Sequence, residues 1–218
     1  MVKKRKLSVL HIGIYLVVFF TVWSVRELYI RPIFLDCLDG IAFGLAESAI
    51  KLLVWTLPAA LLIRHFRDDM WISLKEMFNS RPRWFKDAPL LLIVFVPLVR
   101  AGIWGGFQIN PDFVPSALIS SVLFVGITEE LVFRGFLLNA FLIKLGMPYA
   151  IALDAVLFTL IHFPIWIYRG FTISEFLAAS IAIPILSVFF AYSFIKTKNI
   201  FIPIILHMIW NLQVGLFG

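Results

Sequence analysis

The segment SALISSVLFVGITEELVFRGFLLNAFLI, residues 116–143, decides the fold. Apart from Glu129, Glu130 and Arg134 it carries no charge, and it exceeds the roughly 20 residues that cross a bilayer. Charges at that depth cost free energy and therefore indicate a functional site. On a helix, Glu130 and Arg134 are four residues apart and can form an ion pair, whereas Glu129 lies on an adjacent face. We predict a membrane-spanning helix with one buried carboxylate that lacks a local partner.

The composition extends this reading to the whole chain. Of its 218 residues 61% are hydrophobic, against about half in soluble domains. We therefore predict an all-α fold, a polytopic integral membrane helical bundle with about seven transmembrane helices, forming a single membrane domain over 1–218. Hydropathy places the spans at about 7–25, 41–63, 88–106, 116–143, 148–167, 173–195 and 200–217.

Basic residues set the expected orientation. With a cytoplasmic N-terminus, 13 Lys and Arg residues lie inside, and only Arg26, Arg31 and Arg169 lie outside, as the positive-inside rule requires. The net charge of +6 then reflects topology, and no nucleic-acid partner is expected. We predict a multi-pass protein of a bacterial plasma membrane, with the bilayer as its surroundings and Cys37, the only cysteine, in an external loop.

Two further patterns involve charged residues outside that segment. Glu47 and Lys51 are four residues apart in the second span, which predicts a packed ion pair. In the loop 64–86, apolar residues occur at helical spacing among charges, which predicts an amphipathic segment on the cytoplasmic membrane surface. Those apolar residues are Trp71, Leu74, Met77 and Phe78.

Two later spans each carry a pair of residues at the spacing of one helical turn. Phe158 and His162 share a face of one span, and His207 and Asn211 share a face of the last. A rise of about 1.5 Å per residue puts these groups and Glu129 at similar depths, in a pocket that we expect to be accessible from the cytoplasm. A carboxylate and an imidazole can activate water, while His207 and Asn211 can donate hydrogen bonds to an oxyanion.

These residues carry a family resemblance. Glu129-Glu130-x-x-x-Arg134, Phe158-x-x-x-His162 and His207-x-x-x-Asn211 resemble, in order and spacing, the three motifs of the CPBP family of intramembrane proteases. That family includes type II CAAX prenyl proteases and bacteriocin-processing or self-immunity proteins. The resemblance covers a core at about 116–214. It implies that Glu129 and His162 activate the water, that His207 and Asn211 form the oxyanion site, and that Glu130 and Arg134 support the site structurally.

Metal dependence has two readings. Neither a His-Glu-x-x-His motif nor a pair of cysteines is present, so no zincin or thiolate zinc site is indicated. By ligand type alone, Glu129, His162 and His207 could hold zinc. We favour a protease without a cofactor, because Asn211 would be an uncommon zinc ligand and the site lacks a second evident carboxylate base. The resemblance also extends to metal-free glutamate proteases.

The sequence therefore predicts an intramembrane endopeptidase that hydrolyses a peptide bond of a membrane-associated peptide or protein, such as a prenylated CAAX-type tail or a leader, with a glutamate-activated water. A non-proteolytic membrane scaffold or bacteriocin self-immunity protein is the alternative. An ion-coupled transporter is disfavoured because the sequence shows no repeated halves.

Overall fold

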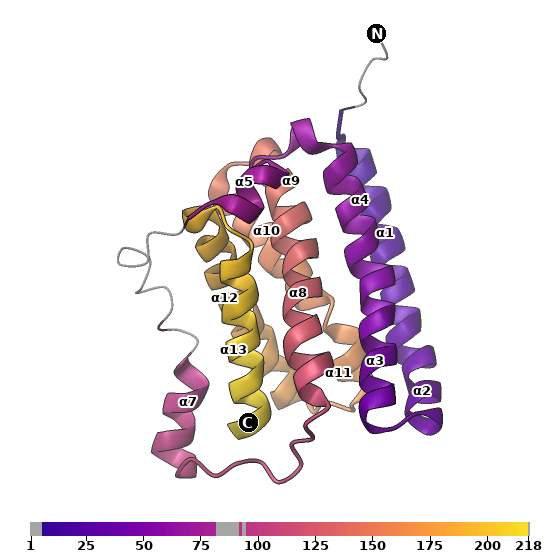
Figure 1. Ribbon diagram of the computed structural model, residues 1–218, viewed down its shortest axis with the longest axis vertical. Coiled ribbons are helices and arrows are strands. Elements are labelled where there is room, and N and C mark those ends of the chain that lie inside the picture. The colour runs from indigo at the N-terminus through magenta and orange to yellow at the C-terminus, as the bar shows by residue number, and fades with distance from the viewer. Residues whose placement is uncertain (1–5, 82–91, 93–94, 218) are drawn as a thin grey trace.

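The computed structural model describes residues 6–81, 92 and 95–217, except for the side chains of 104 and 105. These residues form helices and connecting turns, with no β-strand among them. The helices run side by side along the long axis of the molecule (Figure 1). The predicted all-α membrane bundle is confirmed. Of the predicted third span, 88–106, residues 88–91 and 93–94 lie outside the described residues; the remainder includes α7 (Val96–Arg100) and a π-helical turn at Ala101–Gly105.

The first two long helices form a hairpin. One consists of α1 (Val9–Val25), a π-helical turn at Arg26–Ile30 and α2 (Arg31–Cys37). The second consists of α3 (Gly40–Lys51), a π-helical turn at Leu52–Thr56 and α4 (Leu57–His65). The sequence prediction ended the first span at residue 25, and this boundary is wrong. Charged residues do not end the helix, because Arg26 and Glu27 are buried and form an ion pair there.

Residues after α4 cover one end of the bundle. They include a 3₁₀ turn at Arg67–Asp69 and the short helix α5 (Leu74–Asn79). Asn139 fixes this segment, because its side chain accepts a hydrogen bond from the Ile72 amide at 2.7 Å and donates one to the Ile72 carbonyl at 3.0 Å. Met77 is fully buried in the hydrophobic core. The segment predicted to lie on the membrane surface thus packs against the protein.

The segment 118–144 forms the central helix. It comprises a π-helical stretch at Leu118–Phe124, α8 (Val125–Glu130), a second at Leu131–Leu138, and α9 (Asn139–Lys144). From Thr128 to Phe141 nearly every side chain is buried. Around it lie α10 (Met147–Leu160), α11 (Phe163–Tyr168), α12 (Ile173–Thr197) and α13 (Phe201–Phe217). Helix α13 packs against α8, and α10 packs against α12.

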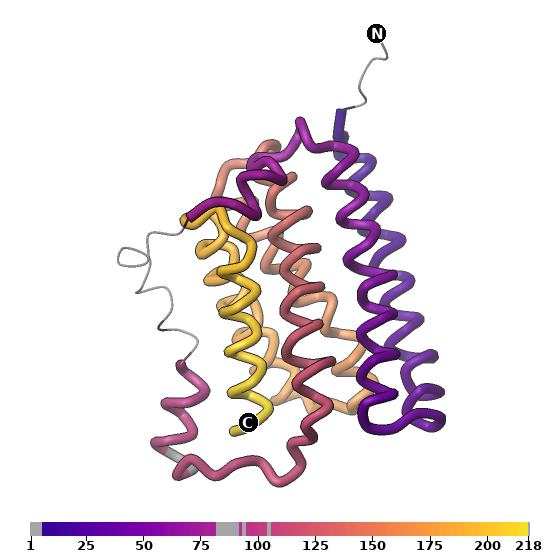
Figure 2. Tube along the Cα trace, viewed as in Figure 1, coloured from indigo at the N-terminus to yellow at the C-terminus, as the bar shows by residue number. Residues whose placement is uncertain are grey.

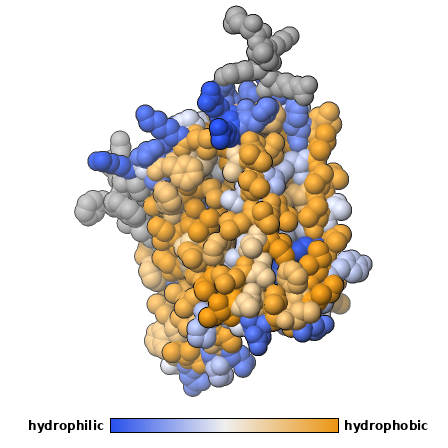
Figure 3. Space-filling view, turned by 45° about the vertical axis from the view of Figure 1, so that its right-hand side comes forward, coloured by the Kyte–Doolittle hydropathy of each residue, from blue (hydrophilic) through white to orange (hydrophobic). Residues whose placement is uncertain are grey.

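Four helical segments are long and apolar enough to cross a membrane, namely Val9–Cys37, Gly40–His65, Met147–Tyr168 and Ile173–Thr197. Large apolar side chains such as Val9, Ile173 and Tyr149 are exposed along these helices. A broad apolar band lies between two hydrophilic ends on the face in Figure 3. An apolar surface of this extent is unfavourable in water, so the protein is a membrane protein. The number of crossings stays a prediction.

The two ends of the bundle differ. The start of α1, the end of α4, α5 and the end of α9 lie at one end, which carries Arg64, Lys75, Lys144 and Lys198 and which we call the basic end. The turn between α2 and α3, helix α11 and the end of α13 lie at the opposite end (Figures 1 and 2). The end of the bundle at which a cavity opens therefore determines the side of the membrane from which it can be reached.

Candidate active site

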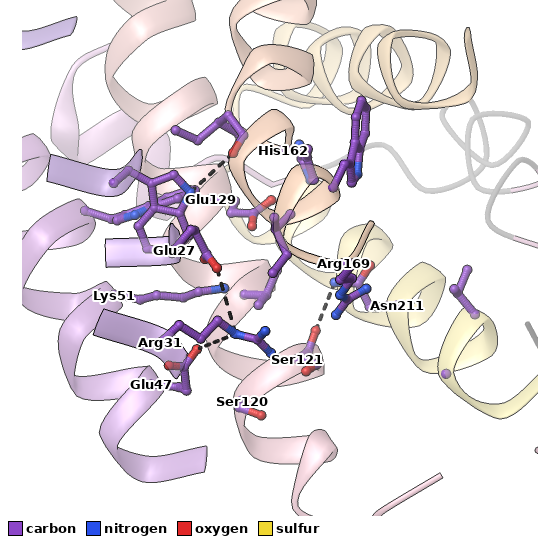
Figure 4. Close-up of a pocket in the computed structure, with 18 of the residues that line it drawn as sticks. Glu27, Arg31, Glu47, Lys51, Ser120, Ser121, Glu129, His162, Arg169 and Asn211 are labelled. Carbon is purple, nitrogen blue, oxygen red and sulfur yellow. Dashed lines mark hydrogen bonds and ion pairs between the residues drawn. The ribbon is translucent and has the colours of Figure 1, made fainter. Parts of the chain in front are cut away.

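One cavity of about 420 Å³ lies between the central helix and its neighbours. It is lined from both halves of the chain, and Figure 4 shows ten of the lining residues by name. Its exposed lining side chains, Ser121, Arg169 and Val214, lie away from the basic end. The cavity therefore opens at the end opposite the start of α1. Its polar lining residues are Glu27, Arg31, Glu47, Lys51, Ser120, Ser121, Glu129, His162, Arg169 and Asn211.

Glu130 and Arg134 form the ion pair that the sequence predicted. The Nη1 atom of Arg134 lies 3.1 Å from Oε1 of Glu130, and both side chains are fully buried. Nη2 donates to the carbonyl and the hydroxyl of Ser187 at 2.9 and 2.6 Å. Asp154 adds a second carboxylate, 3.6 Å from Nε. Arg134 thereby joins α10, α12 and the central helix.

Glu129 lines the cavity and is only 5% exposed. Its Oε2 atom has no hydrogen-bond partner among the described residues. The nearest ionisable partner is His207, whose Nε2 lies 3.9 Å from that oxygen, beyond hydrogen-bond distance. A buried carboxylate oxygen that lacks a donor is costly unless water or substrate supplies one. The predicted buried carboxylate without a partner on its own helix is therefore present, and it lines the cavity.

His162 lies in the turn between α10 and α11 and directly precedes Phe163, the first residue of α11. Its Nδ1 lies 2.7 Å from the carbonyl oxygen of Phe158, one turn earlier. A carbonyl oxygen can only accept, so Nδ1 carries the hydrogen and Nε2 of the neutral ring is an acceptor. His162 and Glu129 both line the cavity and interact electrostatically (Figure 4). Together they can hold a water molecule between two acceptors.

His207 lies behind Glu129 and is not among the cavity-lining residues. Its Nδ1 is 2.7 Å from Oε1 of Glu130, and its ring stacks on Phe190 at 4.9 Å. Because a carboxylate accepts, Nδ1 is the donor, and Nε2 faces Glu129. The structure thus places His207 between two carboxylates.

Asn211 lines the cavity one turn further along α13. Its Nδ2 donates to the carbonyl oxygen of Ser121 at 3.0 Å. An amide nitrogen has two hydrogens, so the second can serve a ligand. The cavity therefore brings together three of the four predicted catalytic residues, and the fourth, His207, lies outside the lining with its Nε2 atom 3.9 Å from Glu129. Their catalytic roles stay predictions.

A second charged cluster contributes Glu27, Arg31, Glu47 and Lys51 to the other wall of the cavity, and it was not predicted. Arg26 pairs with both Glu27 and Glu47, and Arg31 lies 3.8 and 3.9 Å from the same two carboxylates. The sequence predicted an ion pair between Glu47 and Lys51, but this pair does not form. Lys51 lies over the rings of Trp23 and Trp55, and Glu129 is its strongest electrostatic partner. The signal available in the sequence was the set of charges themselves, inside or next to apolar runs.

Zinc was the alternative reading of Glu129, His162 and His207. Within the described part of the chain, no three His, Cys, Asp or Glu side chains are gathered closely enough to hold a metal ion. His207 directs one nitrogen at Glu130 and the other toward Glu129. The residues present do not fit a metal centre in this arrangement.

Fold and site together define a polytopic helical membrane protein with a carboxylate, an imidazole and a carboxamide around one cavity. The family model described as Type II CAAX prenyl endopeptidase Rce1-like matches residues 111–213. The match contains all three motifs and confirms the family resemblance that they predicted over this part of the chain. Neither a curated protein nor a solved structure matches the chain.

Proposed function

We propose that this protein is an intramembrane endopeptidase that uses Glu129 to activate water. The observation that carries the proposal is the Glu129 carboxylate, which is buried, lines the cavity and has an oxygen without a donor, while His162 offers a second acceptor in the same cavity. A water molecule held by these two groups can lose a proton as it attacks. We propose that no metal takes part.

The reaction can be written with this chain's own groups. The water oxygen attacks the carbonyl carbon of the peptide bond, and its proton passes to Glu129. The oxyanion that forms accepts a hydrogen bond from the free N–H of Asn211. When the carbon–nitrogen bond breaks, Glu129 returns the proton to the leaving amine, so that the products are an amine and a carboxylic acid, which then ionises by giving its proton to the amine. Glu129 is kept in place by residues that do not line the cavity, namely Glu130, Arg134 and His207.

The opening of the cavity bears on the substrate. We infer a cytoplasmic N-terminus in a bacterial plasma membrane from the excess of basic residues at one end. The cavity opens at the other end. With the inferred orientation we propose access from the outer face, in place of the access from the cytoplasm that the sequence led us to expect. This favours a membrane peptide or an exported leader as substrate over a prenylated tail made in the cytoplasm.

The test of function is peptide cleavage by the purified, reconstituted protein. Glu129→Gln keeps the shape of the side chain but removes the basic oxygen, so cleavage is expected to fall about 10²- to 10⁴-fold while the protein stays folded. Glu76→Gln is the matched control, because Glu76 is 40% exposed at the basic end and pairs with Lys198. Cleavage that is equal in both variants would refute the role of Glu129. No cleavage of any membrane peptide by the wild type would favour the scaffold or immunity function.

The orientation has its own test. Cys37 ends α2, is exposed and is the only cysteine in the sequence. A membrane-impermeant maleimide is expected to label it on intact spheroplasts. In a Cys37→Ser background, Asn79→Cys at the basic end is expected to react only after lysis, because Asn79 is exposed on α5. The reverse pattern would place the cavity on the cytoplasmic side.

A further inference from the structure

The oxyanion site that the sequence predicted has only one of its two donors at the cavity. Asn211 lines the cavity, whereas His207 lies outside the lining. Nδ1 of His207 is held by Glu130 at 2.7 Å, and its Nε2 faces Glu129. Asn211 already gives one hydrogen to the carbonyl oxygen of Ser121. A single neutral N–H is therefore left for the oxyanion, and a hydrogen bond from a cation would be about twice as strong.

Lys51 supplies a cation to the cavity lining, and its N–H donors are unused. It is partly buried and lies near the middle of the apolar helical segment Gly40–His65. Its ammonium group lies over the rings of Trp23 and Trp55, 5.6 and 5.9 Å from their centres. Within the part of the chain that the structure describes, this group forms no hydrogen bond and no ion pair. A cation in the middle of a membrane helix is costly and therefore indicates a functional role.

Lys51 is near the two groups that would hold the water. Helix α3, which ends at Lys51, packs against α8, which carries Glu129. Glu129 is the charged group with which Lys51 interacts most strongly, and His162 interacts with both. Figure 4 shows Lys51 and Asn211 on opposite sides of the cavity, with Glu129 between them in this view. Because Lys51 and Glu129 are not in contact, a peptide carbonyl can enter between them.

The proposed reaction moves negative charge away from Glu129. When the water gives its proton to Glu129, that carboxylate becomes neutral and the peptide oxygen becomes an oxyanion. Lys51 then loses its strongest counter-charge and gains a new one in the same cavity. Charges interact strongly in a cavity that excludes most water, so a cation that serves the oxyanion lowers the barrier of this step. The flexible lysine side chain has three N–H donors with which to reach it.

We infer that Lys51 is a further catalytic residue, which donates a hydrogen bond to the oxyanion beside Asn211. The inference rests on the proposed function, because the oxyanion forms only if Glu129 activates water. Lys51 keeps its proton throughout, so the proton balance of the reaction is unchanged. It takes the place in the oxyanion site that was predicted for His207. Lys51 lies outside the family match, so the first half of the chain also contributes to the chemistry.

The experiment measures kcat and KM for reconstituted variants of Lys51. The probe is the membrane peptide that the wild type cleaves fastest in the assay of function above. Lys51→Met removes the charge and the donors from an unbranched side chain. It is expected to lower kcat about 10²- to 10³-fold, as for the loss of one oxyanion donor, and to leave KM unchanged. Lys51→Arg restores a cation with N–H donors and is expected to recover about tenfold of that loss.

Lys75→Met is the matched control, because Lys75 is exposed on α5 at the basic end. It is expected to keep both constants. Cleavage that depends on Glu129 but is equal in Lys51→Met and Lys75→Met would overturn the role of Lys51 and keep the peptidase. A raised KM with an unchanged kcat would also overturn it, because Lys51 would then bind the substrate and not the oxyanion. If no membrane peptide is cleaved, the proposed function fails and this inference fails with it.

Melting temperatures distinguish catalysis from folding. Where Lys51→Met lowers the melting temperature, Lys51→Gln takes its place, because it keeps a neutral N–H donor and removes only the charge. A Lys51→Gln variant that melts like the wild type is expected to have a kcat lowered about tenfold or more, which Lys51→Arg recovers in part. A normal kcat in that folded variant would show that Lys51 serves only the structure, and the inference would be wrong.

Discussion

Two charged clusters lie beside the cavity, and they are built differently. The first reaches the cavity lining only through Glu129, the second through several of its members. On one wall, Glu130 and Arg134 are neighbours on one helix, joined by Asp154 from the next. On the other wall, Arg26 in the first helix reaches Glu47 in the second. The first cluster follows from local sequence spacing, whereas the second exists only once two helices have packed.

Their charges also differ in sign. The first wall has three carboxylates, those of Glu129, Glu130 and Asp154, against one guanidinium. The second wall has three cations, Arg26, Arg31 and Lys51, against two carboxylates. Each wall is therefore stabilised in part by the other, as the interaction of Lys51 with Glu129 illustrates. The family match covers only the first wall, but the cavity needs both.

The largest effect is expected from removing the central guanidinium of either cluster. Arg134→Ala and Arg26→Ala each remove the buried guanidinium that lies between two carboxylates, Glu130 and Asp154 or Glu27 and Glu47, which costs about 3–5 kcal/mol. Both variants should show a strongly lowered melting temperature in detergent. Arg67→Ala is the control, because Arg67 is 65% exposed and its removal is expected to leave the melting temperature unchanged. A normal melting temperature for Arg26→Ala alone would show that only the first cluster is structural.

This comparison explains what the sequence could predict. Glu130 and Arg134 were paired correctly because helical geometry fixes neighbours four residues apart. The same rule failed for Glu47 and Lys51. There, two arginines from another helix reach the carboxylate, and the lysine packs on tryptophan rings instead. Local spacing predicts a pair only where no distant residue competes for the same group.

The wrong prediction of where the first span ends has the same cause. A run of charges normally ends a membrane span, which led to an expected end at residue 25. Arg26 and Glu27 instead lie inside a helix that continues to Cys37, because their charges are neutralised by each other and by Glu47. Likewise, the motifs predicted that Glu129, His162 and Asn211 would meet. They did not predict that His207 would approach from behind, because helix rotation is set by packing.

Smaller effects on stability are expected from replacing glycines that pack beside the two walls. A Cβ atom at Gly126 would lie 2.8 Å from Cγ of Met208 and 3.3 Å from the carbonyl oxygen of Ile204, both on α13. Gly126→Ala should therefore push α13 away and cost about 1–3 kcal/mol. A Cβ at Gly44, beside the second wall, would meet nothing closer than 3.5 Å.

Gly44→Ala should thus be neutral or stabilising by about 0.5–1 kcal/mol, since alanine favours a helix. The measurement is the difference in melting temperature between the two variants, together with peptide cleavage. Gly126→Ala is expected to reduce cleavage as well, because α13 carries His207 and Asn211. Equal melting temperatures would mean that α13 can shift without cost and that its contact with α8 does not set the site.

The smallest expected effect is that of a chelator, which should leave cleavage unchanged. A zinc mechanism needs His207 as a ligand, but its Nδ1 is held by Glu130 at 2.7 Å. Using Nε2 with Glu129 and His162 would require the three side chains to draw together, and the described residues are not arranged so. A zinc peptidase treated in parallel controls for the chelator.

Elemental analysis of the purified protein completes this test. Stoichiometric zinc, with cleavage lost to the chelator and restored by the metal, would contradict the glutamate mechanism. Glu129, His162 and His207 would then be ligands, because zinc itself would lower the pKa of its bound water and Glu129 would no longer be the base. Such a result would also alter the comparison of the two walls. A bound cation would supply the positive charge that the first wall now takes from Lys51, and Lys51→Met would then leave cleavage unchanged.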